Sequence, residues 1–222
     1  MGLNKIDKPK PLAKIALDAL RRSILSNELT PDVVYNEKAL AQSLGISRTP
    51  VREALLELSS KRLVRFLPQK GVVINTFSGK DIEEVFEIRT ALELFSVNKI
   101  CNNTRELDST SLKKCLDEQR EALRTNDPIA FMEADRAFHI GFTRLTGNDY
   151  LLDMMQGIRD IMHLMGCRAL GIEGRMQEVV KEHEKILTAV EEKNSKTSMA
   201  YMEEHLQISK DAVKKTTHKE ES

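Results

Sequence analysis

The spacing of hydrophobic residues predicts that the chain begins with helices. In residues 11–27 apolar side chains recur about every 3.6 positions, as they do on one face of a helix. A second, shorter helix is expected over residues 37–44, with Ala39, Leu40 and Leu44 directed inward. The first part of the chain is therefore expected to be helical up to a turn near residue 45.

A third helix is expected directly after this turn. Gly45 is suited to the left-handed end of the second helix, and the hydroxyl of Ser47 is suited to cap the first N–H groups of the third. The inward stripe of the third helix is then formed by Val51, Leu55 and Leu58.

The pattern next changes from helix to short strands. Residues 63–67 and 72–75 are apolar runs on either side of a turn at residues 68–71, which predicts a hairpin. Three short helices followed by a hairpin are arranged as in a winged helix-turn-helix domain. We assign this domain to residues 1–77.

From Ser78 onward the apolar spacing predicts only helices. Turn-forming residues divide this part into about six helices, with a charged and frayed tail at residues 216–222. The predicted fold class is therefore mainly α: a winged helix-turn-helix of three helices and a β-hairpin, followed by an all-helical bundle at residues 78–222.

The composition indicates a globular protein, with 41% hydrophobic and 31% charged residues. No apolar run approaches the roughly 18 residues of a membrane span, and the first residues lack the apolar stretch of a secretory signal. We therefore expect a cytoplasmic protein with no membrane partner. Three scattered cysteines, Cys101, Cys115 and Cys167, lack CxxC spacing and are expected to be small buried residues.

The net charge of zero conceals an uneven distribution. Residues 1–77 carry 13 Lys and Arg against 7 Asp and Glu, which leaves 21 basic and 27 acidic residues for the rest of the chain. A basic first domain on an acidic second one indicates that the first domain contacts a polyanion.

The outer face of the third helix carries candidate DNA contacts. Arg48 and Arg52 lie one turn apart near its N-terminus, where a recognition helix enters the major groove and arginine binds the O6 and N7 atoms of guanine. Ser47 and Thr49 add hydroxyls beside a helix N-terminus, which suits a phosphate. The alternative is a pair of solvated surface arginines, but the order of turn, cap, arginine pair and hairpin favours DNA binding.

A longer stretch is similar to a known family. The segment NEKALAQSLGISRTPVREALLEL, followed by LVRFLPQKGVVI, resembles the GntR family of bacterial transcription regulators. The resemblance implies a helix-turn-helix at about residues 37–56 and a wing that enters the minor groove. The DNA-contacting positions that it implies are Lys38, Arg48, Thr49, Arg52, Lys70 and Gly71.

Two positions depart from the family pattern. The family usually has glycine where Arg62 stands and often where Asp32 stands. Glycine at such places indicates a positive φ or a tight bend, so we expect Arg62 and Asp32 to adopt that backbone conformation.

Candidate metal ligands lie in the second domain. Asp135 and His139 are four positions apart and share one helix face, and His183 and His205 lie on two later helices. Three imidazoles and a carboxylate suit a divalent ion such as zinc or nickel. From the spacing alone, surface hydrogen bonds and exposed histidines remain the alternative.

Further motifs in this domain add weight to the metal site. The segments EIRTALELFSV, DRAFHIGFTRLTGN, EHEKILTAV and MEEHL resemble the all-helical FCD effector domain of the FadR-type branch of the same family. In metal-binding members of that branch the ligands are an aspartate and three histidines. By this resemblance the ligands here are Asp135, His139, His183 and His205.

The same resemblance implies a small-molecule site beside the metal. Two open coordination positions can bind a small carboxylate effector, and Arg89 lies at the family's pocket-facing arginine position. The alternative for Arg89 is a surface ion pair with Glu93. Val179 replaces a hydroxyl residue that is frequent in related sequences, which predicts a more apolar pocket floor. His163 matches no ligand position, and Met154, Met155, Met162 and Met165 are expected to fill the core.

These observations favour a ligand-responsive transcription regulator over an enzyme. We expect a homodimer on a palindromic DNA operator, acting as a repressor that the effector releases. Two alternatives are a DNA-binding protein with a purely structural metal, and a metalloenzyme with a DNA-binding anchor, for which no HExxH motif is present.

Overall fold

The computed structural model describes residues 11–104, 106–166 and 169–217. The chain divides after Thr76 into two compact units, and each is described by itself. None of the described helices is both long and apolar enough to cross a membrane.

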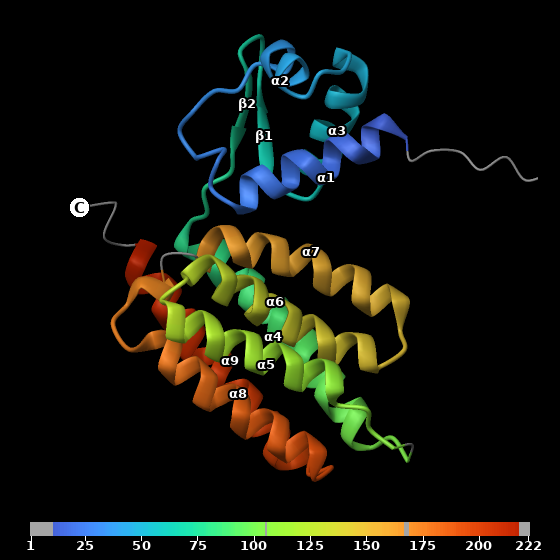
Figure 1. Cartoon of the computed structure of the whole chain (residues 1–222), viewed down its shortest axis with the longest axis vertical. Coiled ribbons are helices and arrows are strands. Elements are labelled where there is room, and N and C mark those ends of the chain that lie inside the picture. The colour runs from blue at the N-terminus through green and yellow to red at the C-terminus, as the bar shows by residue number, and fades with distance from the viewer. Residues whose placement is uncertain (1–10, 105, 167–168, 218–222) are drawn as a thin grey trace, which may run out of the picture. The chain divides into compact units, whose positions relative to one another are not determined.

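The first unit consists of helices around a small hairpin (Figure 1). Its elements are α1 (Leu12–Leu25), α2 (Glu37–Ser43), α3 (Arg48–Ser60), β1 (Val64–Leu67) and β2 (Gly71–Ile74). The strands are antiparallel, with Val64 opposite Ile74 and Leu67 opposite Gly71. Tyr35 forms a short extra bridge to Val72 through backbone hydrogen bonds of 2.8 and 2.9 Å.

The core of the first unit is formed mainly by α1 and α3, which pack against each other. Val51, Leu55 and Leu58 of α3 are buried, as the sequence predicts. The expectation for α2 is wrong at Ala39, which is exposed, because the buried face of this short helix is formed by Leu40 and Ala41. With 100° between successive residues, only two or three positions of a seven-residue helix can face a neighbour.

Several turns of the first unit use the left-handed region of the backbone. Gly45 ends the α2 turn with a φ of +66°, and Asp32 and Arg62 have φ values of +68° and +58°. The expectation that Asp32 and Arg62 adopt a conformation favoured by glycine is therefore correct.

The second unit is entirely helical among its described residues. Its elements are α4 (Gly79–Cys101), α5 (Thr110–Thr125), α6 (Pro128–Leu145), α7 (Asp149–Gly166), the 3-10 turn η1 (Ala169–Gly171), α8 (Arg175–Glu191) and α9 (Ser195–Thr217). Polar side chains fix where the helices begin: Ser78 and Asp81 form a reciprocal capping box at α4, and Asp127 accepts from two backbone N–H groups at α6.

Helix α6 lies in the middle of this bundle, against α4, α5 and α7, while α8 packs against α5 and α9. Phe131, Phe138 and Phe142 of α6 are fully buried, and the rings of Phe138 and Phe142 meet edge to face with centroids 5.0 Å apart. The ring of Phe138 also stacks on the imidazole of His183 at 4.3 Å. The apolar core therefore continues directly into a polar interior.

The predicted fold class is confirmed, with nine α-helices and a two-stranded hairpin in the described ranges. Met155, Met162 and Met165 are buried, but Met154 is 57% exposed, so its assignment to the core is wrong. Cys101 is buried and Cys115 is half-buried.

Two sequence expectations fall partly outside the described residues. Cys167 is one of the residues that the structure does not describe. Helix α9 continues to Thr217, two residues into the tail that is expected to fray, and residues 218–222 lie outside the description.

Candidate metal centre and nucleic-acid interface

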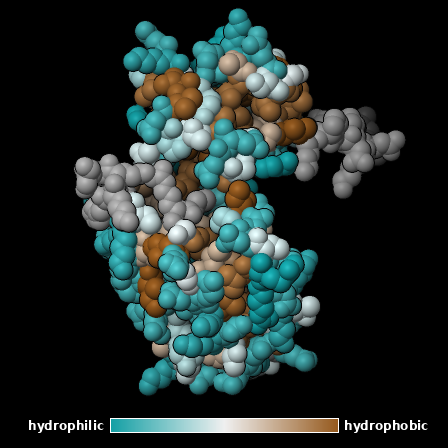
Figure 2. Space-filling model, turned by 60° about the vertical axis from the view of Figure 1, so that its left-hand side comes forward, coloured by the Kyte–Doolittle hydropathy of each residue, from teal (hydrophilic) through white to brown (hydrophobic). Residues whose placement is uncertain are grey.

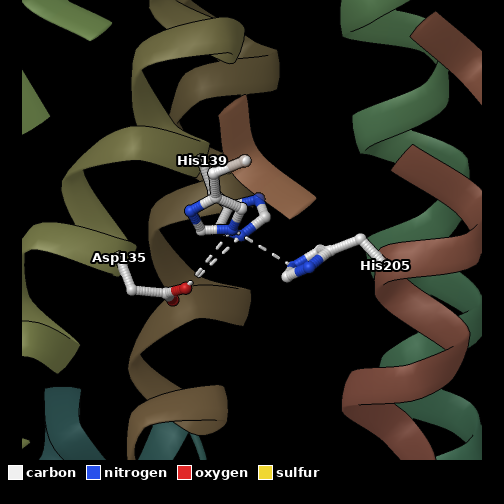
Figure 3. A group of neighbouring side chains, drawn as sticks. Asp135, His139 and His205 are labelled. Carbon is white, nitrogen blue, oxygen red and sulfur yellow. Dashed lines mark hydrogen bonds and ion pairs between the residues drawn. The ribbon is translucent and has the colours of Figure 1, made fainter. Parts of the chain in front are cut away.

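Four side chains from three helices converge in the second unit. Asp135 and His139 lie on α6, His183 on α8 and His205 on α9, and one donor atom from each lies within 4.8 Å of the others. Figure 3 shows Asp135, His139 and His205 directed toward a common centre. His183 Nε2 lies 3.4 Å from His205 Nε2, and Asp135 Oδ1 lies 3.7 Å from Nε2 of both His139 and His183. The four residues that the sequence indicated as ligands are thus brought together.

Each imidazole is oriented by an oxygen that accepts from its other nitrogen. The three pairs are His139 Nδ1 with Glu93 Oε2, His183 Nδ1 with Gln119 Oε1 at 2.9 Å, and His205 Nδ1 with Glu182 Oε2 at 2.6 Å. Because carboxylate and amide oxygens only accept, Nδ1 carries the proton in each ring. Each Nε2 therefore presents its lone pair to the centre, which is the arrangement of metal-binding histidines.

Arg89 gives independent support for this assignment at His139. Its Nε donates to Glu93 Oε1 at 2.7 Å, and its Nη2 lies 3.0 Å from His139 Nε2. Since an arginine has only donors, His139 Nε2 must accept. The alternative of a surface pair between Arg89 and Glu93 is wrong in one respect, because the pair forms but both side chains are buried.

The ionisation of the cluster suits a cation. Burial opposes ionisation of Asp135, but Arg159, which donates to its Oδ2, and His139 outweigh burial and hold the pKa of the carboxyl well below its usual range. Burial and the neighbouring imidazoles lower the pKa of His183 well below its usual value, and burial lowers the pKa of His205 to about 4. At neutral pH these groups are therefore in the forms that bind metal ions.

A small cavity of about 50 Å³ lies beside Asp135. Its polar wall contains the side chains of Arg89, Arg159 and Arg175, and Val179 is part of its apolar wall. Arg175 is held by both oxygens of Glu182 at 2.5 and 2.9 Å. The same carboxylate holds His205, so the cavity and the cluster share a hydrogen-bonded residue.

Sequence reasoning missed several residues of this site. Arg159 and Arg175 were not expected to line a cavity, and no spacing distinguishes them from exposed charges on the same helices. Gln119 is different, because it lies in phase with the buried Leu112 and Leu116 on α5. A polar residue within an apolar stripe was a usable signal for a buried hydrogen-bonding role.

In the first unit Arg48 and Arg52 project from the outer face of α3. Their side chains are 65% and 62% exposed, and both approach Glu37 of α2. A hollow of about 420 Å³ lies between α3 and the hairpin, and both arginines line it together with Lys70. The guanidinium pair and the wing therefore face one concave surface.

The other residues predicted to contact DNA are also at the surface. Lys38 and Thr49 are exposed, and so is Ser47. Ser47 directly precedes α3, but its side chain makes no capping hydrogen bond, so its predicted capping role is wrong. A side-chain cap is found instead at the start of α2, where Asn36 Oδ1 accepts from the backbone N–H of Lys38 at 2.8 Å.

Gly71 serves the fold of the wing. It has a φ of +138°, and a Cβ at this position would collide with the backbone oxygen of Tyr35. The absence of a side chain is therefore required by the contact between the Tyr35 segment and β2. The turn itself contains Gln69, which has a φ of +59°.

Family models match both units of the chain. The family model described as bacterial regulatory proteins of the gntR family matches residues 12–74, and that of the FCD domain matches residues 84–208. The transcriptional regulator YdhC of Bacillus subtilis is 28% identical over 90% of each chain. The gluconate operon transcriptional repressor of Bacillus licheniformis is 27% identical over 76% of this chain and 68% of its own.

The fold is shared with a solved structure. The structure of McbR/YncC of E. coli superposes with a TM-score of 0.83 at 21% identity, over 94% of this chain and all of the other. The gntR family and the two relatives are transcription regulators, in agreement with the prediction that the chain is not an enzyme. The chain belongs to the GntR family of bacterial transcription regulators, with a winged helix-turn-helix followed by an FCD domain.

Proposed function

We propose that this regulator is a repressor whose affinity for its operator is set by a small carboxylate effector bound at a divalent metal ion, zinc or nickel. The metal ligands are Asp135, His139, His183 and His205. The observation that carries the proposal is the convergence of three Nε2 lone pairs and one carboxylate on a single point, with each imidazole oriented by an acceptor.

The donor set fits such an ion. Ligand distances of about 2.0–2.2 Å place neighbouring ligand atoms of an octahedral ion roughly 2.8–3.1 Å apart. The separations of 3.4 and 3.7 Å among His183, His205 and Asp135 therefore need a contraction of up to roughly 0.9 Å. Four protein ligands leave two positions of an octahedral ion open, and the bound ion supplies a Lewis acid for the effector's carboxylate.

Arg89 links the metal site to the cavity. The lone pair of His139 Nε2 cannot both accept from Arg89 and hold an ion. In the metal-bound protein Arg89 therefore loses this acceptor, and its Nη2 becomes available in the cavity wall for an anionic ligand. Arg159 and Arg175 add positive charge to the same wall, which favours a carboxylate over a neutral effector.

The first unit supplies the DNA contact. Arg48, Thr49 and Arg52 contact bases in the major groove, and Lys38 contacts the phosphate backbone. The exposure of these residues, and the hollow that both arginines line, support these contacts. Lys70 lies in the turn of the wing, as expected of a minor-groove contact. The relative from Bacillus licheniformis is named a repressor, which supports repression rather than activation by this chain.

A second copy of the chain is expected to pair through α4. Exposed positions on this helix alternate in steps of four and three, as in a coiled-coil seam: Glu84, Ile88, Ala91, Phe95 and Asn98. Antiparallel pairing centred near Ala91 places Ile88 opposite Phe95 of the partner subunit. Hydrophobic residues do reach the surface of the helical unit (Figure 2), and a two-fold interface of this kind suits a palindromic operator.

The signal must pass from the second unit to the DNA. Only residues 75–78 separate the end of β2 from the start of α4, so a shift of α4 is transmitted through a short connection. The effector changes operator affinity only if it binds two dimer geometries unequally, and about 1.4 kcal/mol of difference gives a tenfold change.

The proposal is tested by operator binding of the full chain. Duplex DNA selected by the protein from a random pool serves as the operator, and its Kd is measured with zinc-loaded, nickel-loaded and chelated protein and with a panel of small carboxylates. We expect one carboxylate to weaken binding about tenfold or more in the loaded protein. The effect should vanish in His139→Ala and persist in His163→Ala, because His163 is a buried histidine outside the four-residue cluster.

The outcomes separate this proposal from its alternative. If the metal raises thermal stability but no carboxylate changes the operator Kd, the ion has a structural role only. If chelated and loaded protein also melt at the same temperature, the metal site itself is wrong.

A further inference from the structure

The carboxylate of Glu37 is largely buried behind two arginines, on the surface that contacts DNA in the proposed function. Glu37 is only 12% exposed, although the side chains of its partners Arg48 and Arg52 are 65% and 62% exposed. Arg52 Nη1 donates to Glu37 Oε1 at 3.2 Å, and Arg48 Nη2 lies 3.6 Å from Glu37 Oε2. Arg52 Nη1 also donates to Oε2 at 3.4 Å, so Glu37 lies behind both arginines and its Oε2 is shared between them.

The contacts leave a useful set of donors unused. Arg52 meets Glu37 through Nη1, so its Nε and Nη2 remain as a parallel donor pair. Such a pair matches the O6 and N7 acceptors of guanine. Glu37 also lines the hollow between α3 and the wing, with both arginines and Lys70.

We propose that Glu37 is a positioning residue for DNA recognition, which holds Arg48 and Arg52 in the geometry that reads bases. This inference rests on the proposed contact of α3 with the operator. Long arginine side chains lose rotamer freedom when they bind, and a fixed counter-ion in the free protein reduces that loss. The negative charge also lowers attraction to any DNA backbone, so Glu37 favours the operator over other sequences.

This role predicts opposite effects on two measurable quantities. In Glu37→Gln the two arginines lose their ion pairs with the carboxylate, and the net charge of the first unit rises by one. We expect binding to random-sequence DNA to strengthen, with a slope of log K against log salt that is steeper by up to about 0.9. The ratio of operator to random-sequence affinity should fall roughly tenfold.

Asp18→Asn is the matched control. It removes one negative charge and one ion pair, with Lys14 on α1, from the same unit, but Asp18 does not line the hollow. We expect the ratio of operator affinity to random-sequence affinity in this variant to equal that of the wild type. Glu37→Asp, which keeps the charge but shortens the side chain, should keep the wild-type salt slope and have a ratio between those of the wild type and Glu37→Gln.

The measurement is fluorescence anisotropy of the full chain with the selected operator and a scrambled duplex over a range of salt concentrations. If Glu37→Gln strengthens binding to both duplexes equally, Glu37 only repels phosphate and the inference is overturned. If Glu37→Gln leaves both affinities unchanged, it is overturned as well. If the wild type itself does not discriminate between the duplexes, the proposed operator recognition by the first unit is wrong, independently of Glu37.

Discussion

Arg52 has a planar fork of donors that meets a carboxylate on one side and solvent on the other. The buried stripe of Val51, Leu55 and Leu58 on the same helix fixes which way this fork points. The sequence was sufficient for that direction, because helical periodicity places residue 52 away from the stripe. It did not show Glu37 as a partner, since a contact between residues 15 positions apart depends on how α2 and α3 pack.

Replacing Arg52 by alanine should relax operator discrimination. The loss should be about 1–3 kcal/mol at the contacted base pair, because one bidentate pair to guanine contributes about that much. Competition binding with single-base variants of the selected operator measures it, with Lys61→Ala at the far end of α3 as the control. A wild-type specificity profile for Arg52→Ala would contradict the assignment of α3 as the recognition helix.

Gly71 gives a second prediction for a single residue. In Gly71→Ala the new Cβ meets the Tyr35 backbone, and the φ of +138° is strained for alanine. We expect the free energy of unfolding of the first unit to fall by about 1–3 kcal/mol. Gly45→Ala in the same unit, where a Cβ would meet nothing within 4 Å although φ is +66°, should cost less in the same denaturation experiment. Equal stability of the two variants would show that the Tyr35 contact is not rigid.

At the scale of elements, α4 has two faces with different tasks. One carries Arg89 and Glu93 in phase with Phe86 and Val97, and it is buried. The other exposes Ile88 and Phe95. The sequence predicted this helix and its start, but an apolar residue at position 88 or 95 looks the same whether it packs within the chain or against a second copy.

Phe95→Glu should therefore dissociate the dimer. A charge in the centre of an apolar two-fold seam is placed there twice, once from each subunit, so the penalty is doubled. Ile129→Glu on α6 is the control, since Ile129 is 52% exposed and Phe95 51%. Sedimentation equilibrium should give a monomer for Phe95→Glu and a dimer for the control. Unchanged dimers in both variants would rule out α4 as the interface.

Other elements show where pattern reasoning stops. Two helix starts in the second unit follow from capping residues that the sequence displays, Ser78 before α4 and Asp127 before α6. The hydrogen-bond acceptors of the histidines are harder to predict from the sequence, because Glu182 directly precedes His183 in the chain yet accepts from His205. Only the packing of α8 against α9 makes that pairing, and no local spacing contains it.

For the whole molecule, the chain combines a basic first unit with an acidic helical unit that contains the candidate metal site. An ion that binds only the folded second unit stabilises that unit, by about 2.7 kcal/mol at a free concentration a hundredfold above its Kd. In calorimetry, zinc should raise the melting temperature of the helical unit and leave that of residues 11–76 unchanged. An equal shift of both units would mean that the ion does not bind where we place it.

The central claim is that Asp135, His139, His183 and His205 together hold one divalent ion. It is tested most directly by the metal content of the full chain after equilibration with zinc or nickel and removal of the excess. We predict about one ion per chain for the wild type and for His163→Ala, and a large loss for His183→Ala. Full occupancy in His183→Ala, or no retained ion in the wild type, would contradict the account.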